Sequence, residues 1–148
     1  MPAKLYVVNG SHPCVTAQEA LERKGVEYKL VEFPPPAHAA IMPLLFGGRT
    51  VPGIKFEDGE KVQGSRAILR RLEERHPEPP LYGASAEERR RIEEAELWGD
   101  EVLQAIARRL LWPAFQKDPA AMAGYQTGSK LPAMPVPMLK AVAPVAPR

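Results

Sequence analysis

Two short runs of this sequence combine residues that can hold a small anion through backbone groups. The first is Thr50-Val51-Pro52, before an apolar stretch, and the second is Gln63-Gly64-Ser65, before an amphipathic stretch. Proline is tolerated at the entry of a strand, and the first N–H groups of a helix are free to bind an anion. The two runs therefore predict a binding corner for one small anionic ligand. Ser65 is also explained as an ordinary N-cap without any ligand.

Near the start of the chain, Ser11 and Cys14 place a hydroxyl and a thiol at the beginning of an expected helix. A hydroxyl in that position can donate to a bound thiolate, which the helix dipole also favours. Ser11 fits the role of helix N-cap equally well. Cys14 is the single cysteine, so the sequence excludes an intramolecular disulfide and a Cys-x-x-Cys pair. We expect Cys14 to be a small packed side chain rather than a nucleophile.

Composition and charge narrow the classes of function. The 148 residues are 45% apolar and 26% charged, as in a soluble globular protein. A net charge of +2, with the arginines of residues 89–91 balanced by neighbouring glutamates, argues against a nucleic-acid partner. The three histidines lack metal-ligand spacing, so no metal site is predicted. No apolar run reaches the ~20 residues of a membrane span and no signal peptide is evident, which predicts a cytoplasmic protein without a membrane partner.

Hydrophobic periodicity divides the first half of the chain into a recognisable order of elements. Asp58-Gly59 is a strong signal for a two-residue hairpin turn, and Gly25 is a good residue to follow the end of a helix. The expected order is strand, helix, strand, short helix, two strands and helix, at residues 4–8, 14–24, 26–33, 37–45, 53–57, 60–62 and 66–75. This βαβ-α-ββα order predicts an α/β thioredoxin-like domain over residues 1–76.

The second half predicts helices. Residues 77–85 are a linker by their proline content, and Ser85 with Glu88 forms a capping box that begins a long helix, expected to end before Trp112-Pro113. Five prolines between residues 131 and 148 forbid a regular helix there. We expect residues 86–148 to be a partial, truncated all-α domain with a Pro-rich tail. That tail is either extended, partly disordered, or a helical region cut short.

The motifs, in this order, resemble the glutathione S-transferase family over about residues 4–112. In that family the bond corresponding to Val51–Pro52 is cis, and the resemblance implies that the Val51 backbone pairs with the cysteinyl part of glutathione. It also implies that Gly64 and Ser65 hold the γ-glutamyl carboxylate and that the sulfur faces Ser11. Gly64 departs from the family, which commonly has an acidic residue before the serine. Gln63 is the residue that can compensate, unless its side chain points to solvent.

Three functions of different classes follow from these residues. The leading one is a glutathione-dependent transferase: Val51, Pro52, Gln63, Gly64 and Ser65 bind glutathione as substrate, Ser11 activates its thiol, and a small electrophile lies near Trp98 or Trp112. The second is a non-catalytic module of the same fold, which Gly64 and the short helical region favour. Thiol–disulfide exchange is disfavoured, because Ser11 cannot form a thiolate. The resemblance further implies a cytosolic homodimer.

Overall fold

In the computed structural model, residues 1–35, 37–135, 137–138 and 140 are described. The chain divides into two compact units. The first comprises Met1–Leu81 together with Gly128–Leu131, and the second comprises Tyr82–Thr127 together with Pro132–Arg148. The division after Leu81 falls within the stretch that the sequence assigns to a linker. Each unit is described by itself.

The first unit has the predicted order of elements. These are β1 (Ala3–Val7), α1 (His12–Arg23), β2 (Tyr28–Glu32), α2 (His38–Phe46), β3 (Gly53–Lys55), β4 (Lys61–Gln63) and α3 (Ser65–Arg75). The strands form one sheet in the order β2-β1-β3-β4. β1 and β2 are parallel, and the pairs β1–β3 and β3–β4 are antiparallel. This mixed sheet with its helices confirms the predicted α/β thioredoxin-like architecture.

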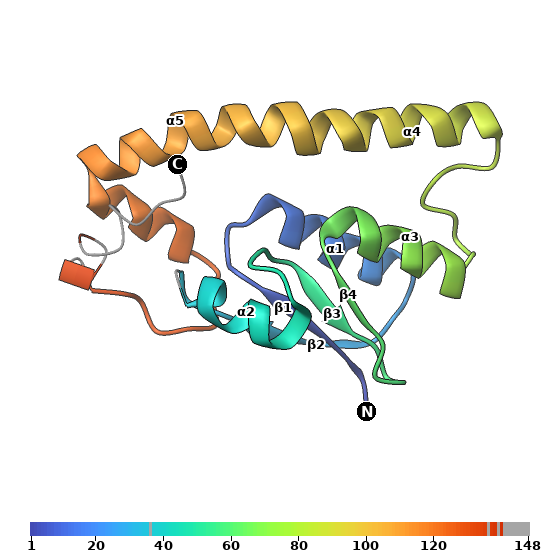
Figure 1. Cartoon of the computed structure of the whole chain (residues 1–148), viewed down its shortest axis with the longest axis horizontal. Coiled ribbons are helices and arrows are strands. Elements are labelled where there is room, and N and C mark those ends of the chain that lie inside the picture. Colours follow the sequence, from blue (N-terminus) through green and yellow to red (C-terminus); the bar gives the residue numbers. More distant parts are fainter. Residues whose placement is uncertain (36, 136, 139, 141–148) are drawn as a thin grey trace. The chain divides into compact units, whose positions relative to one another are not determined.

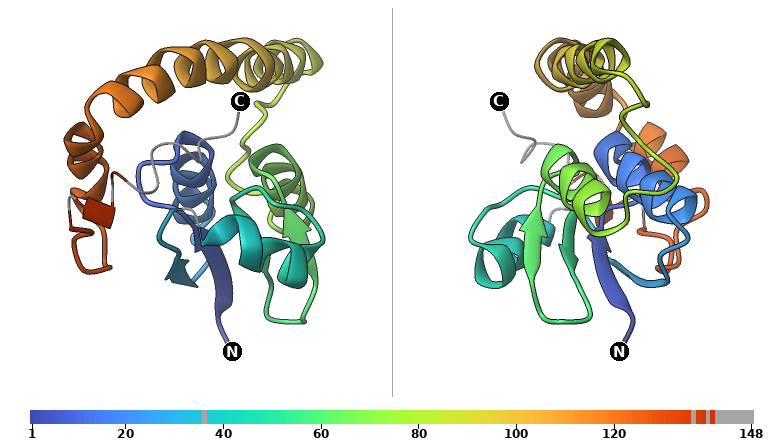
Figure 2. Two further views of the ribbon diagram at one scale, coloured as in Figure 1. Left: turned by 60° about the vertical axis from the view of Figure 1, so that its left-hand side comes forward. Right: turned by 90° about the vertical axis from the view of Figure 1, so that its right-hand side faces the viewer.

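Helices cover the two faces of the sheet differently (Figure 1 and Figure 2). Ala3, Leu5 and Val7 of β1 are buried against α1 and α3 because successive side chains of a strand point to opposite faces. The core on this face is completed by buried residues of α1, α3 and β3 and by one residue after β3, namely Cys14, Ala17, Ala20, Leu21, Ile54, Phe56, Ile68 and Leu72. Tyr6, between Leu5 and Val7, lies on the other face, where α2 packs.

The packing of α2 is close enough to require glycine beneath it. The Tyr6 ring stacks on Phe33, with centroids 6.0 Å apart, and meets Phe46 edge-on at 5.3 Å. A Cβ on Gly53 would lie 2.8 Å from Met42 Cε and 2.9 Å from the Phe46 ring, closer than real Cβ contacts. The absence of a side chain at residue 53 therefore lets α2 sit directly over β3, next to the proline that precedes it.

A buried lysine fastens the end of the first unit. Lys24, at the C-cap of α1, has a fully buried side chain, and its ammonium lies 2.5 Å from Glu73 Oε2 of α3. The same ammonium donates to the carbonyl oxygens of Pro77 (3.2 Å) and Pro79 (2.7 Å). Glu73 in turn accepts from the Leu81 backbone N–H at 3.0 Å. Two helices and the segment after α3 are thereby held by one charged pair.

The second unit is a long helical stretch with a short irregular end. α4 (Ala86–Trp98), a π-helical turn η1 (Gly99–Leu103) and α5 (Gln104–Lys117) follow one another without a break, and the 3-10 segment η2 (Pro119–Gln126) comes next. The predicted capping box is present: the Ser85 hydroxyl accepts from Glu88 N–H at 3.2 Å, and Glu88 Oε2 accepts from Ser85 N–H at 3.0 Å. Among the described residues, no helix has the length and apolar character to cross a membrane.

The predicted end of this helix before Trp112-Pro113 is wrong, since α5 continues through Pro113 to Lys117. Phe115 and Met122 form a small buried cluster with Trp112 and Met134, which stabilises the helix beyond the proline. Residues 132–135 of the proline-rich tail lie in neither helix nor strand. The prediction for residues 136, 139 and 141–148 falls outside the described residues.

Candidate functional site

Ser11 lies at the turn between β1 and α1, with a hydroxyl that does not cap the helix. Its backbone is extended, and its carbonyl accepts from Cys14 N–H (2.9 Å) and Val15 N–H (3.1 Å), so Ser11 occupies the N-cap position. Its side chain makes no capping hydrogen bond. The hydroxyl thus lies at a helix N-terminus without capping it, and its protein partner is the Cys14 thiol, which it would exchange for a bound anion.

Cys14 is a core residue in the first turn of α1. Its side chain is 1% exposed, and it packs with Ala17 and Leu5 in the main core. Burial raises the pKa of the Cys14 thiol, an effect only partly offset by a hydrogen bond with the Ser11 side chain. A buried, protonated thiol is a poor nucleophile. The geometry agrees with the packed role expected from the sequence and leaves Ser11 as the polar group of this turn.

The second part of the site is the loop between α2 and β3. The Val51–Pro52 peptide bond is cis, as the resemblance implied. Pro52 is fully buried, and its carbonyl accepts from the Gly64 N–H at 2.9 Å. Among the described residues, none hydrogen-bonds the backbone N–H or C=O of Val51. A half-buried backbone unit with open hydrogen-bonding groups at the start of a strand can pair with an extended ligand.

Gln63 braces this loop from β4. Its side-chain nitrogen donates to the carbonyl oxygens of Gly48 (2.9 Å) and Thr50 (2.7 Å). A Cβ on Gly48 would lie 2.5 Å from Gln63 Oε1, so the glycine makes room for the amide. The side chain therefore points neither to solvent nor away from the site, but fixes the residue before Val51. This role depends on a contact between distant segments, and nothing in the local sequence pattern indicates it.

The third part is the start of α3, which begins one residue earlier than the sequence suggested. Gly64 is the N-cap, with φ 92° and ψ 138°, and Ser65 is the first helical residue rather than the cap. The first helical hydrogen bond runs from Ile68 N–H to the Gly64 carbonyl at 3.0 Å. No side chain caps α3, which leaves the Ser65 hydroxyl and the first amides of the helix for an anion.

The structure thus brings Val51, Pro52, Gln63, Gly64 and Ser65 together through direct hydrogen bonds between the loop, β4 and the start of α3. Ser11 is positioned separately, at the end of β1, the strand that pairs with β3. Two further polar side chains of the first unit, Tyr6 and His38, lie elsewhere. Tyr6 is engaged with Phe33 and Phe46, and burial lowers the pKa of His38, which sits in α2. In the part of the chain that the structure describes, no group of His, Cys, Asp or Glu side chains can hold a metal ion.

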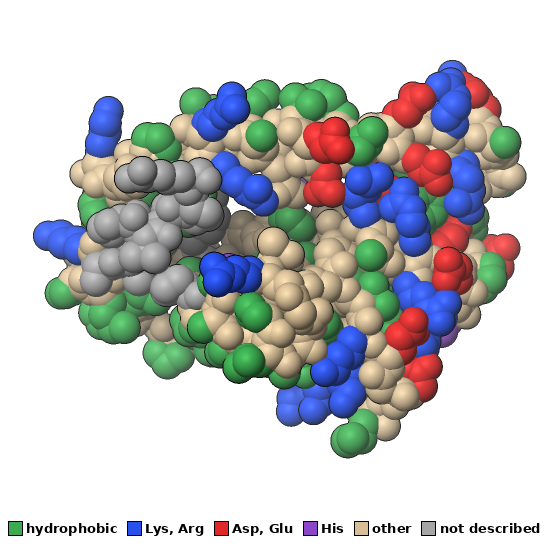
Figure 3. Space-filling model, viewed as in Figure 1, with side chains coloured by type: hydrophobic (Ala, Val, Ile, Leu, Met, Phe, Trp, Pro, Cys, Tyr) green, Lys and Arg blue, Asp and Glu red, His purple; other side chains and the backbone are tan. Residues whose placement is uncertain are grey.

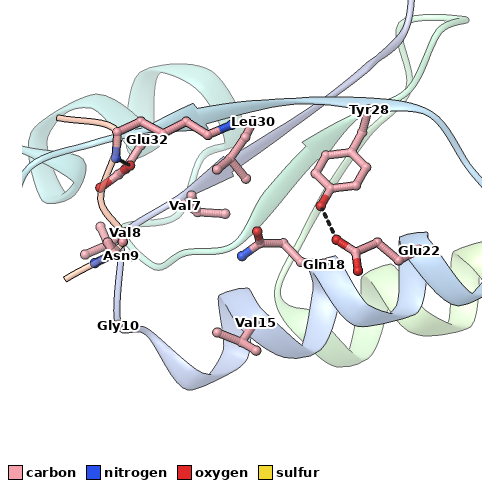
Figure 4. Close-up of a pocket in the computed structure, with 12 residues that line it drawn as sticks. Val7, Val8, Asn9, Gly10, Val15, Gln18, Glu22, Tyr28, Leu30 and Glu32 are labelled. Carbon is pink, nitrogen blue, oxygen red and sulfur yellow. Dashed lines mark hydrogen bonds between the residues drawn. The ribbon is translucent and has the colours of Figure 1, made fainter. Parts of the chain in front are cut away.

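A cavity of about 390 Å³ lies between α1 and β2 (Figure 4). The Tyr28 hydroxyl donates to Glu22 Oε1 at 3.1 Å across its rim, and burial together with Glu22 raises the pKa of Tyr28 to about 12. Glu32, at its other end, accepts from the Lys130 N–H at 2.8 Å. None of the predicted site residues lines this cavity, whose apolar walls come from Val7, Val8, Val15 and Leu30.

Comparison with known proteins identifies the fold and the family. The model of the glutathione S-transferase N-terminal domain matches residues 5–80, more than half of the 148 residues. The chain belongs to the glutathione S-transferase family. The match runs from within β1 to beyond the end of α3, and the transferase-like order of elements predicted from the sequence is thereby confirmed. No curated protein matches the chain.

Solved structures of the family share its fold. A glutathione S-transferase from Rhodospirillum rubrum F11 is 19% identical with a TM-score of 0.63, over 97% of this chain and 60% of that one. A glutathione transferase homolog from Sulfitobacter with bound glutathione is 16% identical (TM-score 0.66; 97% and 67% covered). A glutathione S-transferase from Methylobacterium radiotolerans in complex with glutathione sulfonate is 22% identical (TM-score 0.69; 97% and 64% covered). The chain therefore spans about three-fifths to two-thirds of the length of these proteins.

Proposed function

We propose that this chain binds glutathione in the corner formed by the Val51–Pro52 loop and the start of α3. The observation that carries the proposal is the open backbone of Val51 next to an α3 N-terminus that no side chain caps. Glutathione is an extended tripeptide with two carboxylates, so it can use both features at once. Family membership supports the same assignment, as do the glutathione bound to one structural neighbour and the glutathione sulfonate bound to another.

In this proposal each part of the corner has its own task. The Val51 N–H and C=O pair with the cysteinyl backbone of glutathione in the manner of an added strand. The Ser65 hydroxyl and the first amides of α3 hold the γ-glutamyl carboxylate. The Gly64 N–H is already bonded to Pro52, so Gly64 contributes the shape of the turn rather than a donor. Gln63 acts as a positioning residue, since its side-chain amide already donates hydrogen bonds to the carbonyls of Gly48 and Thr50.

Binding is tested by isothermal titration of glutathione into the wild-type chain and into Ser65→Ala. A hydrogen bond to a charged group contributes about 1.5–3 kcal/mol, so the substitution is expected to weaken binding about 10- to 100-fold. Ser85→Ala is the matched control, because Ser85 caps α4 in the second unit and touches no part of the corner. Absence of any binding by the folded wild-type chain, or equal losses in both variants, contradicts the proposal.

For the reaction, we propose conjugation of glutathione to a small electrophile, with Ser11 as the activating group. The Ser11 hydroxyl donates to the glutathione sulfur and favours its thiolate, and the thiol proton leaves to solvent. With a chloronitrobenzene, the thiolate forms the new carbon–sulfur bond and chloride departs with its electron pair. The Ser11 side chain makes no capping hydrogen bond to α1, and this favours the role.

Conjugation is tested by the pH profile of kcat/KM with such a chloronitrobenzene. Loss of a hydrogen bond to a thiolate is expected to move the profile of Ser11→Ala up by about one to two pH units, because each unit equals 1.36 kcal/mol. Ser11→Thr keeps the hydroxyl and is expected to restore the wild-type profile. An unchanged profile in Ser11→Ala rejects Ser11 as the activating group while leaving the binding proposal intact.

The alternative is a non-catalytic glutathione-binding module. Gly64, which lacks the acidic side chain common in the family, favours it, as does a second unit whose described helices leave large apolar side chains such as Leu110 exposed. Binding by titration without conjugation of any electrophile selects this alternative. Thiol–disulfide exchange receives no support, because the Cys14 thiol is buried and its pKa is raised.

We also propose, from family membership, that the chain is a cytosolic homodimer. Size-exclusion chromatography with light scattering measures its mass directly. A mass near twice 16.3 kDa is the expected result, and a monomeric mass at micromolar concentration contradicts it.

A further inference from the structure

A row of four lysines crosses the whole sheet of the first unit. Lys4 of β1 is directly opposite Lys29 of β2 on one side and Lys55 of β3 on the other. Lys55 is in turn directly opposite Lys61 of β4. Because residues in register on neighbouring strands project from the same face, all four side chains share one face of the sheet. With strands about 4.8 Å apart, the row is about 14 Å long.

The row lies on the α2 face and at the foot of that helix. The neighbouring row on the same face contains Tyr6 and Gly53, which are in contact with Phe46 and Met42 of α2. The lysine row is displaced by two residues toward the N-terminus of β1, and the end of α2 reaches it only at Lys61, whose ammonium lies 5.9 Å from the Phe46 ring centroid. Three of the lysines are exposed and Lys4 is half-buried. Figure 3 shows Lys and Arg side chains gathered on this face, near the N-terminus.

The charges of the row are not compensated within the described residues. Lys4, Lys29 and Lys55 have no ion-pair partner there, although salt bridges are numerous elsewhere. Lys61 donates to the Leu45 carbonyl at 2.8 Å, which uses one of its three donors. Glu27 lies two residues before Lys29 and Glu57 lies two residues after Lys55, and neither glutamate forms an ion pair with these lysines. Like charges directly opposite each other destabilise a sheet, so a bound polyanion that neutralises this row of three neighbouring pairs would gain that energy.

We propose that this lysine row is a binding surface for inorganic polyphosphate, a linear chain with one negative charge on each phosphate. An ammonium is a compact point charge that suits the tetrahedral oxygens of phosphate from any direction, whereas recognition of a planar carboxylate favours arginine. The row contains lysine alone. A linear polyanion that lies along the row neutralises all four charges together.

Other polyanions fit this surface less well. Single-stranded nucleic acid binds through aromatic side chains on which bases stack, but Tyr6 and Phe46 on this face are packed against each other. An anionic membrane is flat, and α2 rises beside the row. An acidic peptide would add to a strand edge, whereas the row runs across the strands. This site is separate from the glutathione corner, and its proposal does not rest on glutathione binding.

The test measures binding of fluorescently end-labelled inorganic polyphosphate by anisotropy at several salt concentrations. Four neutralised phosphates predict a slope of log K against log salt of about −2.8, which is roughly a 50-fold weakening between 50 and 200 mM salt. Lys4→Gln/Lys55→Gln removes the centre of the row and is expected to weaken binding at least tenfold and to halve the slope. Arg109→Gln/Lys117→Gln removes two positive charges from the second unit, brings the net charge from +2 to 0 in the same way, and serves as the control.

The expected result is tight, salt-dependent binding that the row variant loses and the control variant keeps within about twofold. The row variant is also expected to unfold at a higher temperature than the wild type in low salt, because three like-charge contacts are removed; this confirms that it is folded. Three outcomes overturn the proposal: no binding of polyphosphate, equal loss in both variants, or tighter binding of oligothymidylate, polyglutamate or phosphatidylserine vesicles than of polyphosphate.

Discussion

Replacing Lys24 by methionine tests how the first unit is held together. The Lys24 side chain is fully buried, and its ammonium contacts Glu73 Oε2 at 2.5 Å and two proline carbonyls at 2.7 and 3.2 Å. Lys24→Met fills a similar volume but removes the lysine from the Glu73 carboxylate, which is 15% exposed and still accepts from the Leu81 N–H. Breaking a buried pair in this way costs about 3–5 kcal/mol.

The loss is measurable because domains of this size are stable by only about 5–15 kcal/mol. With a urea m-value of about 2 kcal/mol/M, the midpoint of unfolding of Lys24→Met is expected to fall by about 2 M. Arg23→Met is the matched control: the exposed Arg23 precedes Lys24, and its interaction with the α1 dipole contributes less than about 1 kcal/mol.

A double variant separates the net contribution of the pair to stability from the cost of removing only one of its partners. In Lys24→Met/Glu73→Leu no buried charge remains, and Pro77 and Pro79 are exposed, so their carbonyls can bond water. Most of the lost stability is expected to return, as for other buried ion pairs replaced by apolar side chains. A midpoint shift below about 0.5 M in Lys24→Met, or a double variant as unstable as the sum of both single variants, refutes this reasoning.

Three further outcomes are expected. An alanine Cβ at residue 64 would meet no atom within 4 Å, but the residue must adopt φ 92°, so Gly64→Ala is expected to lower the free energy of unfolding in urea by about 1–3 kcal/mol. Gly99 is helical, and Gly99→Ala is expected to be neutral or stabilising. Equal effects of the two substitutions contradict the backbone argument. The native Cys14 thiol is expected to resist a thiol reagent at pH 8 and to react once the chain is unfolded, because burial raises its pKa; rapid native reaction contradicts this. A backbone hydrogen bond from Glu60 chiefly lowers the pKa of Asp58, and a hydrogen bond from an arginine chiefly lowers that of Glu60, so their stabilisation is present above about pH 4 and is lost as the pH falls through these lowered values. In thermal unfolding between pH 2 and 5, the melting temperature of Glu60→Gln is expected to fall less with acid than that of the wild type. An equal fall in both proteins contradicts a stabilising role of the Glu60 carboxylate.

Local pattern predicted the first unit because its strands and helices bury alternating or periodic apolar residues. The capping box at Ser85, the order from β1 to α3 and a hairpin near Asp58-Gly59 were all visible in the sequence. The predicted two-residue turn is wrong in length, because Lys55 lies opposite Lys61 and Phe56 N–H bonds the Glu60 carbonyl, which leaves a three-residue loop at 57–59. Two further errors have a common cause. The sequence placed the N-cap at Ser65 and ended the long helix before Pro113, whereas tertiary contacts decide both positions. The Pro52–Gly64 hydrogen bond fixes the turn before α3, and the cluster of Phe115 and Met122 supports α5 past its proline.

The role of Gln63 is the part of the site least accessible from sequence, and it changes how the corner should be understood. A glutamine beside a binding serine suggests a direct ligand contact. Its amide instead bonds the carbonyls of Gly48 and Thr50, so the backbone that precedes Val51 is held before any ligand arrives. A binding edge that is already ordered loses less entropy when it pairs with a ligand, and this raises affinity without an added contact. The same two hydrogen bonds occupy the Gln63 amide, so it is not available to replace the side chain missing at Gly64. We therefore expect affinity for the γ-glutamyl end to depend on Ser65 and the first amides of α3, where Ser65→Ala measures it.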